Sequence, residues 1–515
     1  MTLSRTLALA ASVASGVLLW VASPAVGAGP LAWVALLPAA VVALARPETR
    51  LGRAALPFAY VVFLELLLVP ALPFGIARDQ WGEPPVPILV GDSPVVVVAL
   101  VVVPLAGLAL YAVRFPQPLM GETRALVLVL VPAVVWTALD VARAKLDPGG
   151  FWGPLFLSQA ETEARGVAAF AGPWLVTFAL VALNFALALA LLRRDPLPAA
   201  LAVLAAGALV AFPRPNADGE RLRVAAIQPG YDTAEFDLAV NHYLRRAFRD
   251  LERASLDLAR DLAPLTRAAA ERGAEIAVWP EATVWVDPAE NARVRRDLTD
   301  LAAETGVVLV VPYFLRGPDH GAAVAFLPDG TVTRPQPKQR PMWFLGERGG
   351  NRTDPEPVDA GTARVGTLLG VDTQEPGTAR TLATAGATLL ASSTHDWAAL
   401  AEPQIALARL HAVALARPIV RADWRYGSAI VGADGDVLAT AGPEKRQVAL
   451  VADVETPTAT TPYTRVGDVL GWLCLVALAP IGLVAYLRRL RRERADAQGA
   501  AQPLGETELP AHPPA

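Results

Sequence analysis

The sequence predicts a polytopic α-helical membrane protein, with about eight transmembrane helices, that carries one extracytoplasmic α/β domain. Three observations lead to this prediction: the overall composition, a succession of Leu/Val/Ala runs, and a more polar segment at 215–465. Of the 515 residues, 54% are hydrophobic and only 18% are charged. This balance is too apolar for an ordinary soluble protein, so a large part of the chain must face lipid.

The apolar runs are long enough to cross a hydrocarbon core about 30 Å thick. Pro and Gly inside several of them are tolerated where neighbouring helices satisfy the freed backbone groups. The first run also resembles a cleaved signal peptide, but it is longer than an h-region and a second span follows almost at once, which favours a retained helix. The predicted spans are 6–27, 29–46, 54–77, 93–113, 124–143, 167–192, 196–213 and 466–487.

Arginine placement predicts the orientation, because cytoplasmic loops retain Lys and Arg. With the N-terminus inside, every arginine cluster is cytoplasmic, and the acidic loop around Glu83 and the 215–465 segment fall outside. We therefore expect a bacterial cytoplasmic membrane protein whose soluble domain is periplasmic. The clusters are Arg46, Arg50 and Arg53; Arg114 and Arg124; Arg193 and Arg194; and Arg488, Arg489, Arg491, Arg492 and Arg494.

Charge and metal-ligand composition exclude several functions. The net charge of -4 gives no basic footprint for nucleic acid, so we expect no nucleic-acid partner. The single cysteine, Cys474, lies inside an apolar run, which excludes a disulfide framework and a cysteine-based zinc site. His395 and His411 are far apart in sequence, a pattern more typical of structural histidines than of ligands. We predict no metal and no cofactor.

The 215–465 segment alternates between strand and helix patterns. Arg221 to Gln228 is typical of a strand, the segment from about residue 250 to Arg272 of an amphipathic helix, and Glu275 to Trp279 of a second strand. Alternation continues to about residue 453 and predicts a layered α/β domain. The resulting division is 1–214 (about seven transmembrane helices), 215–465 (α/β domain), 466–488 (last transmembrane helix) and 489–515, a cytoplasmic tail expected to be disordered.

Two polar strings in the domain have the residue types of an acid–base site. Trp279-Pro280-Glu281 ends a short apolar strand, where partial burial can raise the pKa of a carboxyl group toward that of a useful base. Lys338 lies in a polar loop, and a fixed cation stabilises negative charge that develops in a transition state. Taken alone, each string is also typical of an exposed turn.

These strings and a third, Gly366 to Asp372, resemble the nitrilase superfamily in the arrangement of the bacterial apolipoprotein N-acyltransferase family. That family has a triad of a glutamate base, a lysine and a cysteine nucleophile. The resemblance places this triad at Glu281, Lys338 and Gly370. Glycine has no side chain, whereas the family's covalent thioester needs a thiolate.

Departures from the family concentrate at this site. Val371 stands where the family has a tyrosine, and the interval from Lys338 to Glu347 is one residue longer than in the family. Cys474 lies mid-span in the last predicted helix, out of reach of the site. Outside the site the resemblance covers almost the whole chain, including Gly150-Phe151-Trp152 in the membrane part.

The resemblance implies a four-layer αββα sandwich for the soluble domain, and phospholipid and diacylglyceryl lipoproteins as partners in the membrane. It also implies the site residues. The catalytic positions are Glu281, Lys338, Gly370 and Glu347, and the substrate-binding positions are Phe151, Trp152, Trp343, Val371, Asp372 and Trp397.

Three functions remain open at this stage. The favoured one is a pseudoenzyme that keeps the lipid- and lipoprotein-binding cavity, because triad members act as a unit and little catalysis survives without the nucleophile. The first alternative is the family's N-acyl transfer from phospholipid to the lipoprotein amine, with a hydroxyl of Thr367, Thr373 or Ser392 as nucleophile. The second is a hydrolase in which Glu281 activates water in the space left by the missing side chain.

Overall fold

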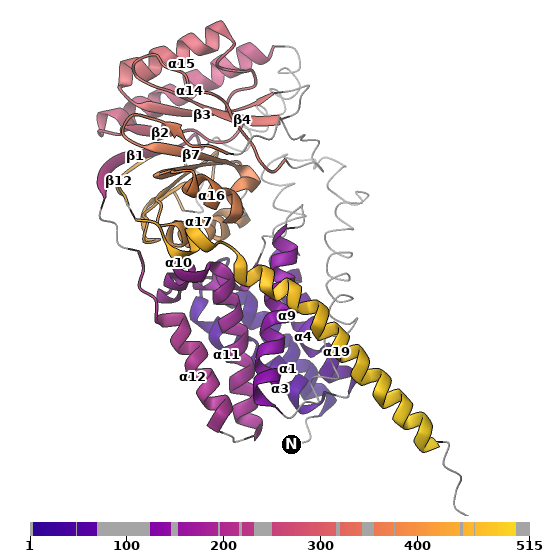
Figure 1. Ribbon diagram of the computed structural model, residues 1–515. Helices are drawn as coiled ribbons and strands as arrows, with labels where there is room; N and C mark the ends of the chain where they lie inside the picture. The colour runs from indigo at the N-terminus through magenta and orange to yellow at the C-terminus, as the bar shows by residue number, and fades with distance from the viewer. Residues whose placement is uncertain are drawn as a thin grey trace, which may run out of the picture.

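The computed structural model consists of a helical bundle and an α/β domain stacked on one end of it (Figure 1). Elements keep the labels of Figure 1. The structure describes residues 4–47, 49–69, 124–145, 153–193, 196–215, 219–230, 250–315, 320–341, 355–374, 376–396, 398–442, 446–457 and 459–500.

Four helices in the described part of the chain are long and apolar enough to cross a membrane: α1, α9, α11 and the stretch Val469–Arg491 of α19. The predicted span 93–113 lies outside the described residues. The helices of the bundle are α1 (Arg5–Ala22), α2 (Ala32–Ala35), α3 (Leu37–Ala45), α4 (Arg50–Val69), α9 (Ala125–Lys145), α10 (Val167–Ala171), α11 (Pro173–Arg193), α12 (Pro196–Val210) and α19 (Val469–Ala500).

Two predicted spans are interrupted. The run 29–46 forms a 3-10 turn at Gly29–Leu31 followed by α2 and α3, with prolines near the start of the turn and of α3. The run 167–192 breaks between α10 and α11 at Gly172, whose φ of +79° no helical residue adopts. A β-carbon at Gly172 would also meet the ring of Tyr463, which packs on this break.

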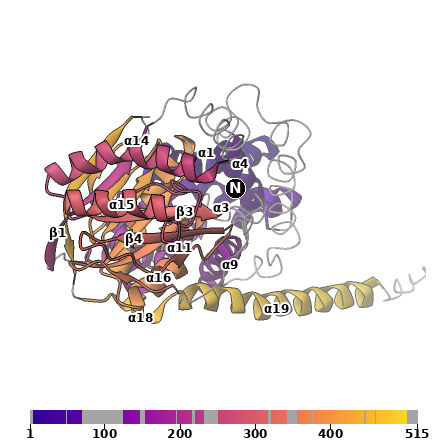
Figure 2. The same ribbon diagram turned by 90° about the horizontal axis from the view of Figure 1, so that it is seen from above.

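The expectation of a disordered tail from residue 489 is wrong for its first part, because α19 continues to Ala500. Arginine and alanine are good helix formers, and Arg489 pairs with Glu493 one helical turn later at 2.5 Å. Figure 2 shows α19 extending well beyond the rest of the molecule. Residues 501–515 lie outside the described part.

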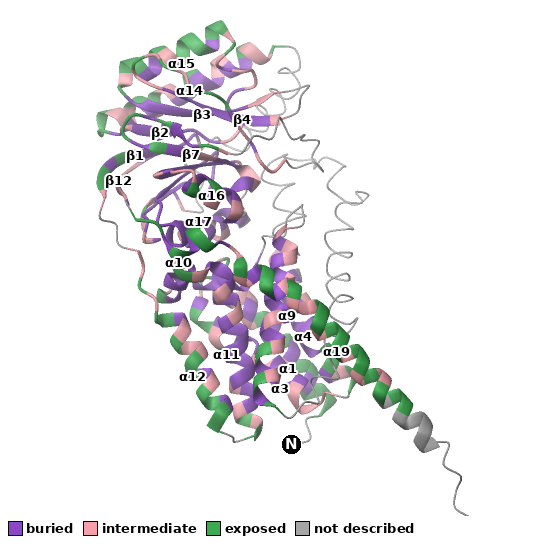
Figure 3. Cartoon of the chain, in the orientation of Figure 1, coloured by how far each residue is buried: buried purple, intermediate pink, exposed green. Residues whose placement is uncertain are grey.

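Exposed apolar side chains cover the outer surface of the bundle. Figure 3 shows α11 mostly buried, while α12 and α19 carry long exposed stretches. Val203, Leu204 and Val476 are among the exposed large apolar residues. Such a surface is stable only against lipid or another apolar partner, which agrees with a membrane protein.

The α/β domain is built from two six-stranded mixed sheets that pack face to face. The first has the order β12-β1-β2-β3-β4-β5 and the second β11-β10-β9-β8-β7-β6. The strands of the first sheet are β1 (Glu220–Gln228), β2 (Ile276–Val278), β3 (Val308–Leu315), β4 (His320–Phe326), β5 (Gln336–Pro337) and β12 (Val448–Thr456). Those of the second are β6 (Val358–Asp359), β7 (Arg364–Leu369), β8 (Leu389–Thr394), β9 (Ile419–Asp423), β10 (Ala429–Val431) and β11 (Val437–Thr440).

Helices cover both outer faces, which gives the four layers expected from the resemblance. On the first sheet, α14 (Leu251–Glu271) and α15 (Ala292–Thr305) close a core that contains Trp279 and Phe326. A second core, with Val224 and Val420, lies between the sheets. On the second sheet, α16 (Pro376–Thr384) and α17 (Ala401–Leu415) pack in a core that continues into the membrane helices.

Strand direction positions the site. The three strands β1, β2 and β3 run parallel, as do β7, β8 and β9 in the other sheet. Carboxyl ends of neighbouring parallel strands meet at one edge of a sheet, where open α/β sheets commonly bind ligands. Glu281 follows β2, and Gly370 follows β7.

Candidate active site

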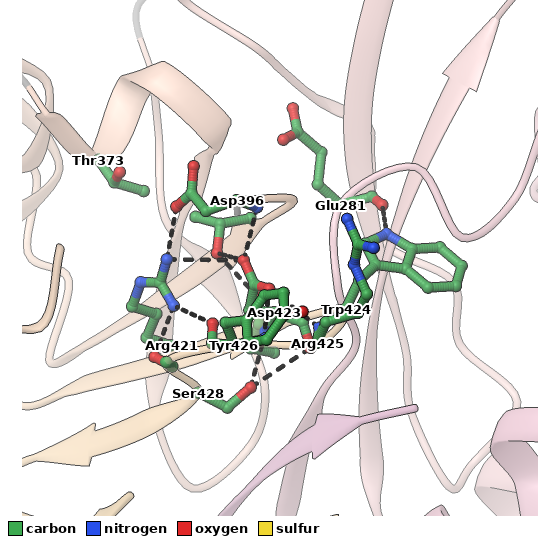
Figure 4. A network of polar contacts seen from close by, with 12 residues as sticks. Glu281, Thr373, Asp396, Arg421, Asp423, Trp424, Arg425, Tyr426 and Ser428 are labelled. Atoms are coloured by element: carbon green, nitrogen blue, oxygen red, sulfur yellow. Dashed lines mark hydrogen bonds and ion pairs between the residues drawn. The ribbon is translucent and has the colours of Figure 1, made fainter. Parts of the chain in front are cut away.

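The main chain at Glu281 is fixed between the two sheets. Its N–H donates to the Thr394 carbonyl at the end of β8 (3.4 Å), and its own carbonyl accepts from the Trp424 indole N–H (2.6 Å). The next residue, Ala282, has a φ of +55°, a left-handed conformation that is rare for a residue with a side chain. Figure 4 shows the Glu281 side chain extending away from this clamp, so its carboxylate is presented from a rigid backbone.

Lys338 supplies the cation predicted for the site. Its backbone N–H donates to the Gly321 carbonyl (2.9 Å), which fixes the residue directly after β5. Its Nζ lies 2.9 Å from Oε1 of Glu281, and the lysine side chain is only 3% exposed. A buried ammonium must be paired, because an unpaired one costs several kcal/mol. Glu281 and Lys338 therefore form one structural unit.

Gly370 lies directly against the Glu281 carboxylate. It follows β7, begins the 3-10 turn Gly370–Gln374, and has a φ of +48°. A β-carbon built on Gly370 would stand 2.6 and 2.7 Å from the two carboxylate oxygen atoms of Glu281. The structure thus brings together all three residues of the predicted triad, and the carboxylate occupies the position of the missing side chain.

Asp372 connects the turn after β7 to the turn that carries Lys338. Its carboxylate accepts from the backbone N–H groups of Gln339 (3.0 Å), Arg340 (2.7 Å) and, at 3.4 Å, Leu369. Burial raises the pKa of Asp372 to about 7, while these N–H donors and Lys338 act in the opposite direction. The sequence-based prediction placed Asp372 in substrate binding; its contacts show a side chain that holds two loops of the site together.

A second charged network beside Glu281 was not predicted as part of the site. Asp396, after β8, pairs with Arg421 of β9 at 2.5 Å, and the Asp423 carboxylate accepts from the Asp396 N–H (2.9 Å) and the Thr394 hydroxyl (2.8 Å). Figure 4 shows this network next to Glu281. Burial, and then the nearby carboxylates of Asp423 and Glu281, raise the pKa of Asp396 to about 7, against the effect of Arg421. The available signal was the pair of charges inside the apolar strand Ile419–Asp423.

Of the remaining predicted site positions, one lies among the described residues. Val371 is half-buried in the turn after Gly370. Cys474 is buried in the candidate membrane span Val469–Arg491 of α19. The other predicted positions, Glu347, Phe151, Trp152, Trp343 and Trp397, lie outside the described residues.

The described geometry has a base and a cation but no nucleophile between them. A carboxylate next to a lysine can take up a proton and stabilise an oxyanion, which are two of the three tasks of a covalent acyl transfer. The third task needs a thiol, a hydroxyl or an activated water. Thr373 offers a hydroxyl nearby, and that hydroxyl donates to the Gly370 carbonyl (2.7 Å).

Two family models match the chain. Residues 15–186 match the apolipoprotein N-acyltransferase N-terminal domain, and residues 223–461 match the carbon-nitrogen hydrolase domain. This combination defines a membrane protein that carries a nitrilase-like α/β domain. An apolipoprotein N-acyltransferase from Geobacter metallireducens is 24% identical, over 93% of this chain and 95% of that protein. The chain belongs to the apolipoprotein N-acyltransferase family.

Two solved structures are similar to part of the chain. A carbon-nitrogen hydrolase from Helicobacter pylori is 17% identical with a TM-score of 0.38, covering 46% of this chain and 90% of that one. A mutant of an amidase of the nitrilase superfamily from Nesterenkonia is 19% identical with a TM-score of 0.37, covering 49% of this chain and 95% of that one.

Proposed function

We propose that this chain acts in lipoprotein maturation as a membrane protein that binds phospholipid and diacylglyceryl lipoproteins but forms no acyl-enzyme intermediate. One observation carries the proposal: the Glu281 carboxylate stands 2.6 to 2.7 Å from the place where a β-carbon of residue 370 would be. Residue 370 has no side chain that could act as a nucleophile, and the Glu281 carboxylate leaves no space for one. The Glu281–Lys338 pair then serves to maintain the binding site.

The first alternative is an active N-acyltransferase, which moves a fatty acyl chain from phospholipid to the N-terminal amine of the lipoprotein. It needs another nucleophile, and one candidate, the Thr373 hydroxyl, donates a hydrogen bond to the Gly370 carbonyl (2.7 Å). Displacement of a reacting group by about 1 Å can cost about a hundredfold in rate. This geometry disfavours covalent transfer.

The second alternative is a hydrolase in which Glu281 activates a water molecule. Its carboxylate and the Lys338 ammonium are in contact, so a base and an oxyanion-stabilising cation are both present. A water molecule would have to enter the space that the Glu281 carboxylate now fills. The hydrolase therefore requires a rearrangement of this side chain.

One labelling experiment separates the three functions. The full-length protein in detergent is incubated with a phospholipid that carries an alkyne on its acyl chain. We expect no covalent label on the wild type. Label removed by hydroxylamine, mapped to Thr373 or Ser392, would establish the transferase, and release of free fatty acid without labelled protein would establish the hydrolase. Mass spectrometry of lipoprotein N-termini, in a strain that depends on this gene alone, tests transfer in the cell.

We propose that both termini face the cytoplasm and that the segment 215–465 faces the periplasm. The last turn of α11, which carries Arg193, and the arginine-rich end of α19 lie at the end of the bundle opposite the α/β domain, which supports this orientation (Figure 1). Reporter fusions are expected to be exported at residue 300 and cytoplasmic at residue 500. An exported fusion at residue 500 would overturn the proposal.

A further inference from the structure

Asp423, the last residue of β9, is a fully buried carboxylate in the charged network beside the candidate active site. Burial of a carboxylate is costly unless donors satisfy both of its oxygen atoms. Figure 4 shows Asp423 within this network. Its donors are the Thr394 hydroxyl and the Asp396 N–H on Oδ2, and the N–H groups of Arg425 and Tyr426 on Oδ1. Each oxygen atom therefore holds a different segment of the chain.

The first segment is the end of β8. Oδ2 of Asp423 accepts from the Thr394 hydroxyl (2.8 Å) and from the Asp396 N–H (2.9 Å). These two bonds lie on either side of the Thr394 carbonyl in the chain, so they fix its direction. That carbonyl accepts from the Glu281 N–H (3.4 Å). One oxygen atom of Asp423 thus determines the position of an acceptor for the main chain of Glu281.

The second segment is the turn after β9. Oδ1 of Asp423 accepts from the N–H groups of Arg425 (3.0 Å) and Tyr426 (3.1 Å), so the side chain closes a turn over the residues that follow it. Trp424 lies inside this turn, and its indole N–H donates to the Glu281 carbonyl (2.6 Å). The other oxygen atom of Asp423 thus determines the position of a donor to the same main chain.

Both segments meet at Glu281, which follows β2 in the opposite sheet. The next residue, Ala282, has a left-handed φ of +55°, and such a conformation persists only where surrounding contacts fix it. The Glu281 carboxylate also lies 2.9 Å from Nζ of Lys338, and a displacement of about 1 Å would break this bond. The contact between Glu281 and Lys338 therefore depends on residues of the second sheet.

We propose that Asp423 positions Glu281, through the Thr394 carbonyl and the Trp424 indole, and so keeps the glutamate in contact with Lys338. Asp423 is a positioning residue in this assignment, since it acts on Glu281 through other residues. The assignment goes beyond the proposed function, because a fixed Glu281 is needed whether the site binds a ligand or also reacts with it.

Lysine labelling measures whether Glu281 stays in contact with Lys338. The chain has three lysines, Lys145, Lys338 and Lys445, so a proteolytic digest assigns each label to one residue. The full-length protein in detergent is treated briefly with an acetylating succinimidyl ester, and mass spectrometry gives the labelling rate of Lys338 relative to that of Lys145. The Lys338 side chain is 3% exposed and paired, so its rate reports how often the pair opens. Lost positioning appears as faster labelling of Lys338 with unchanged labelling of Lys145.

Two variants interrupt the contacts that reach Glu281. Asp423→Asn keeps the size of the side chain but presents an amide donor to one of the two pairs of donors, so we expect Lys338 to be labelled about tenfold faster. Trp424→Phe removes one neutral hydrogen bond and is expected to accelerate labelling about fivefold. In the double variant the effect should be smaller than the product of the single effects, because both changes act on the same contact. An effect equal to the product would overturn the proposal.

Asp396→Asn is the matched control, because it removes an equal charge from the same network. The Asp396 carboxylate pairs with Arg421 at 2.5 Å, whereas its main-chain N–H binds Asp423 and is kept in the variant. We expect Lys338 of this variant to be labelled as in the wild type. If Asp396→Asn and Asp423→Asn accelerate labelling equally, lost charge rather than lost position is the cause and the proposal fails. It also fails if Asp423→Asn folds and is labelled as the wild type is.

A pair of substitutions at Thr394 keeps the test decisive if Asp423→Asn does not fold. Thr394→Val removes the hydroxyl and keeps a similar shape, whereas Thr394→Ser keeps the hydroxyl. Thermal unfolding and the labelling of Lys145 identify any misfolded variant. We expect Thr394→Val to accelerate the labelling of Lys338 severalfold and Thr394→Ser to be labelled as the wild type is. Equal labelling of these two variants would contradict the proposal.

Discussion

Replacing Gly370 by alanine measures how closely the Glu281 carboxylate occupies the nucleophile position. The φ of +48° costs a residue with a side chain about 1 kcal/mol. The new β-carbon would stand 2.6 Å from one carboxylate oxygen, closer than atoms in contact can approach, so the carboxylate must move. Its movement breaks the 2.9 Å bond to Lys338.

The cost of breaking the Glu281–Lys338 ion pair depends on how deeply the pair is buried. Separating a fully buried ion pair costs about 3–5 kcal/mol, and this is an upper limit because Glu281 is 19% exposed and can turn toward solvent. We expect a total cost for Gly370→Ala of about 2–4 kcal/mol. In a Glu281→Ala background only the conformational cost remains, about 1 kcal/mol.

The assay is a double-mutant cycle on thermal unfolding of the full-length protein in detergent. Gly306→Ala is the matched control, because Gly306 has a φ of +68° and a β-carbon there would meet nothing within 4 Å. It reports the conformational cost alone. If Gly370→Ala costs the same with and without Glu281, the carboxylate does not fill the nucleophile position and the reasoning is refuted.

Three further predictions concern the surrounding charges. Lys338→Met leaves the Glu281 carboxylate beside an apolar side chain, so it is expected to lower the stability by about 2–4 kcal/mol in the same unfolding assay. A variant as stable as the wild type would contradict this prediction. The pKa of Asp372 is raised from 3.8 to about 7 in the folded state, so its contribution to stability is complete at low pH and is lost as the pH rises toward 7, by up to about 4 kcal/mol. The stability of wild type relative to Asp372→Asn should fall between pH 4 and 7, and parallel pH profiles would reject this. Arg421→Met leaves two buried carboxylates without their shared cation and is expected to abolish folding of the α/β domain, measured as loss of monodisperse protein, whereas the exposed Arg267→Met should behave as wild type.

The membrane helices show what the sequence can and cannot predict. The predicted span 124–143 corresponds to α9, Ala125–Lys145, because an uninterrupted apolar run has one stable form in lipid. The break at Gly172 was not predicted, since it depends on the close packing of Tyr463, which lies almost 300 residues further along the chain. Hydropathy predicts that a helix is present, whereas an interruption of that helix depends on contacts that form only in the folded protein.

The candidate site also has one part that was predicted before the structure and one part that was not. The resemblance implied that Glu281, Lys338 and Gly370 converge, whereas the sequence pattern alone predicted only alternating strands and helices; in the structure these residues follow β2, β5 and β7. The Asp396–Arg421 pair was missed, because it arises from the parallel register of β8 and β9, which pairs Ser392 with Arg421. Register between distant strands cannot be read from local pattern. The unusual charges in β9 were the only local sign.

The presence of Glu281 and Lys338 beside Gly370 does not by itself indicate catalysis. Either residue alone would leave a charge in a site where the lysine is 3% exposed, so loss of one is costly whether or not the site reacts. The carboxylate also fills the space of the absent nucleophile, which removes the cavity that such a loss would otherwise create. A structural need therefore accounts for both residues, and their identity to the family's base and cation cannot distinguish a binding protein from an enzyme. The two functions differ in whether the Glu281 carboxylate moves away from Gly370 when phospholipid binds. Every chemical role for this glutamate requires a reacting group in the place that the carboxylate now occupies.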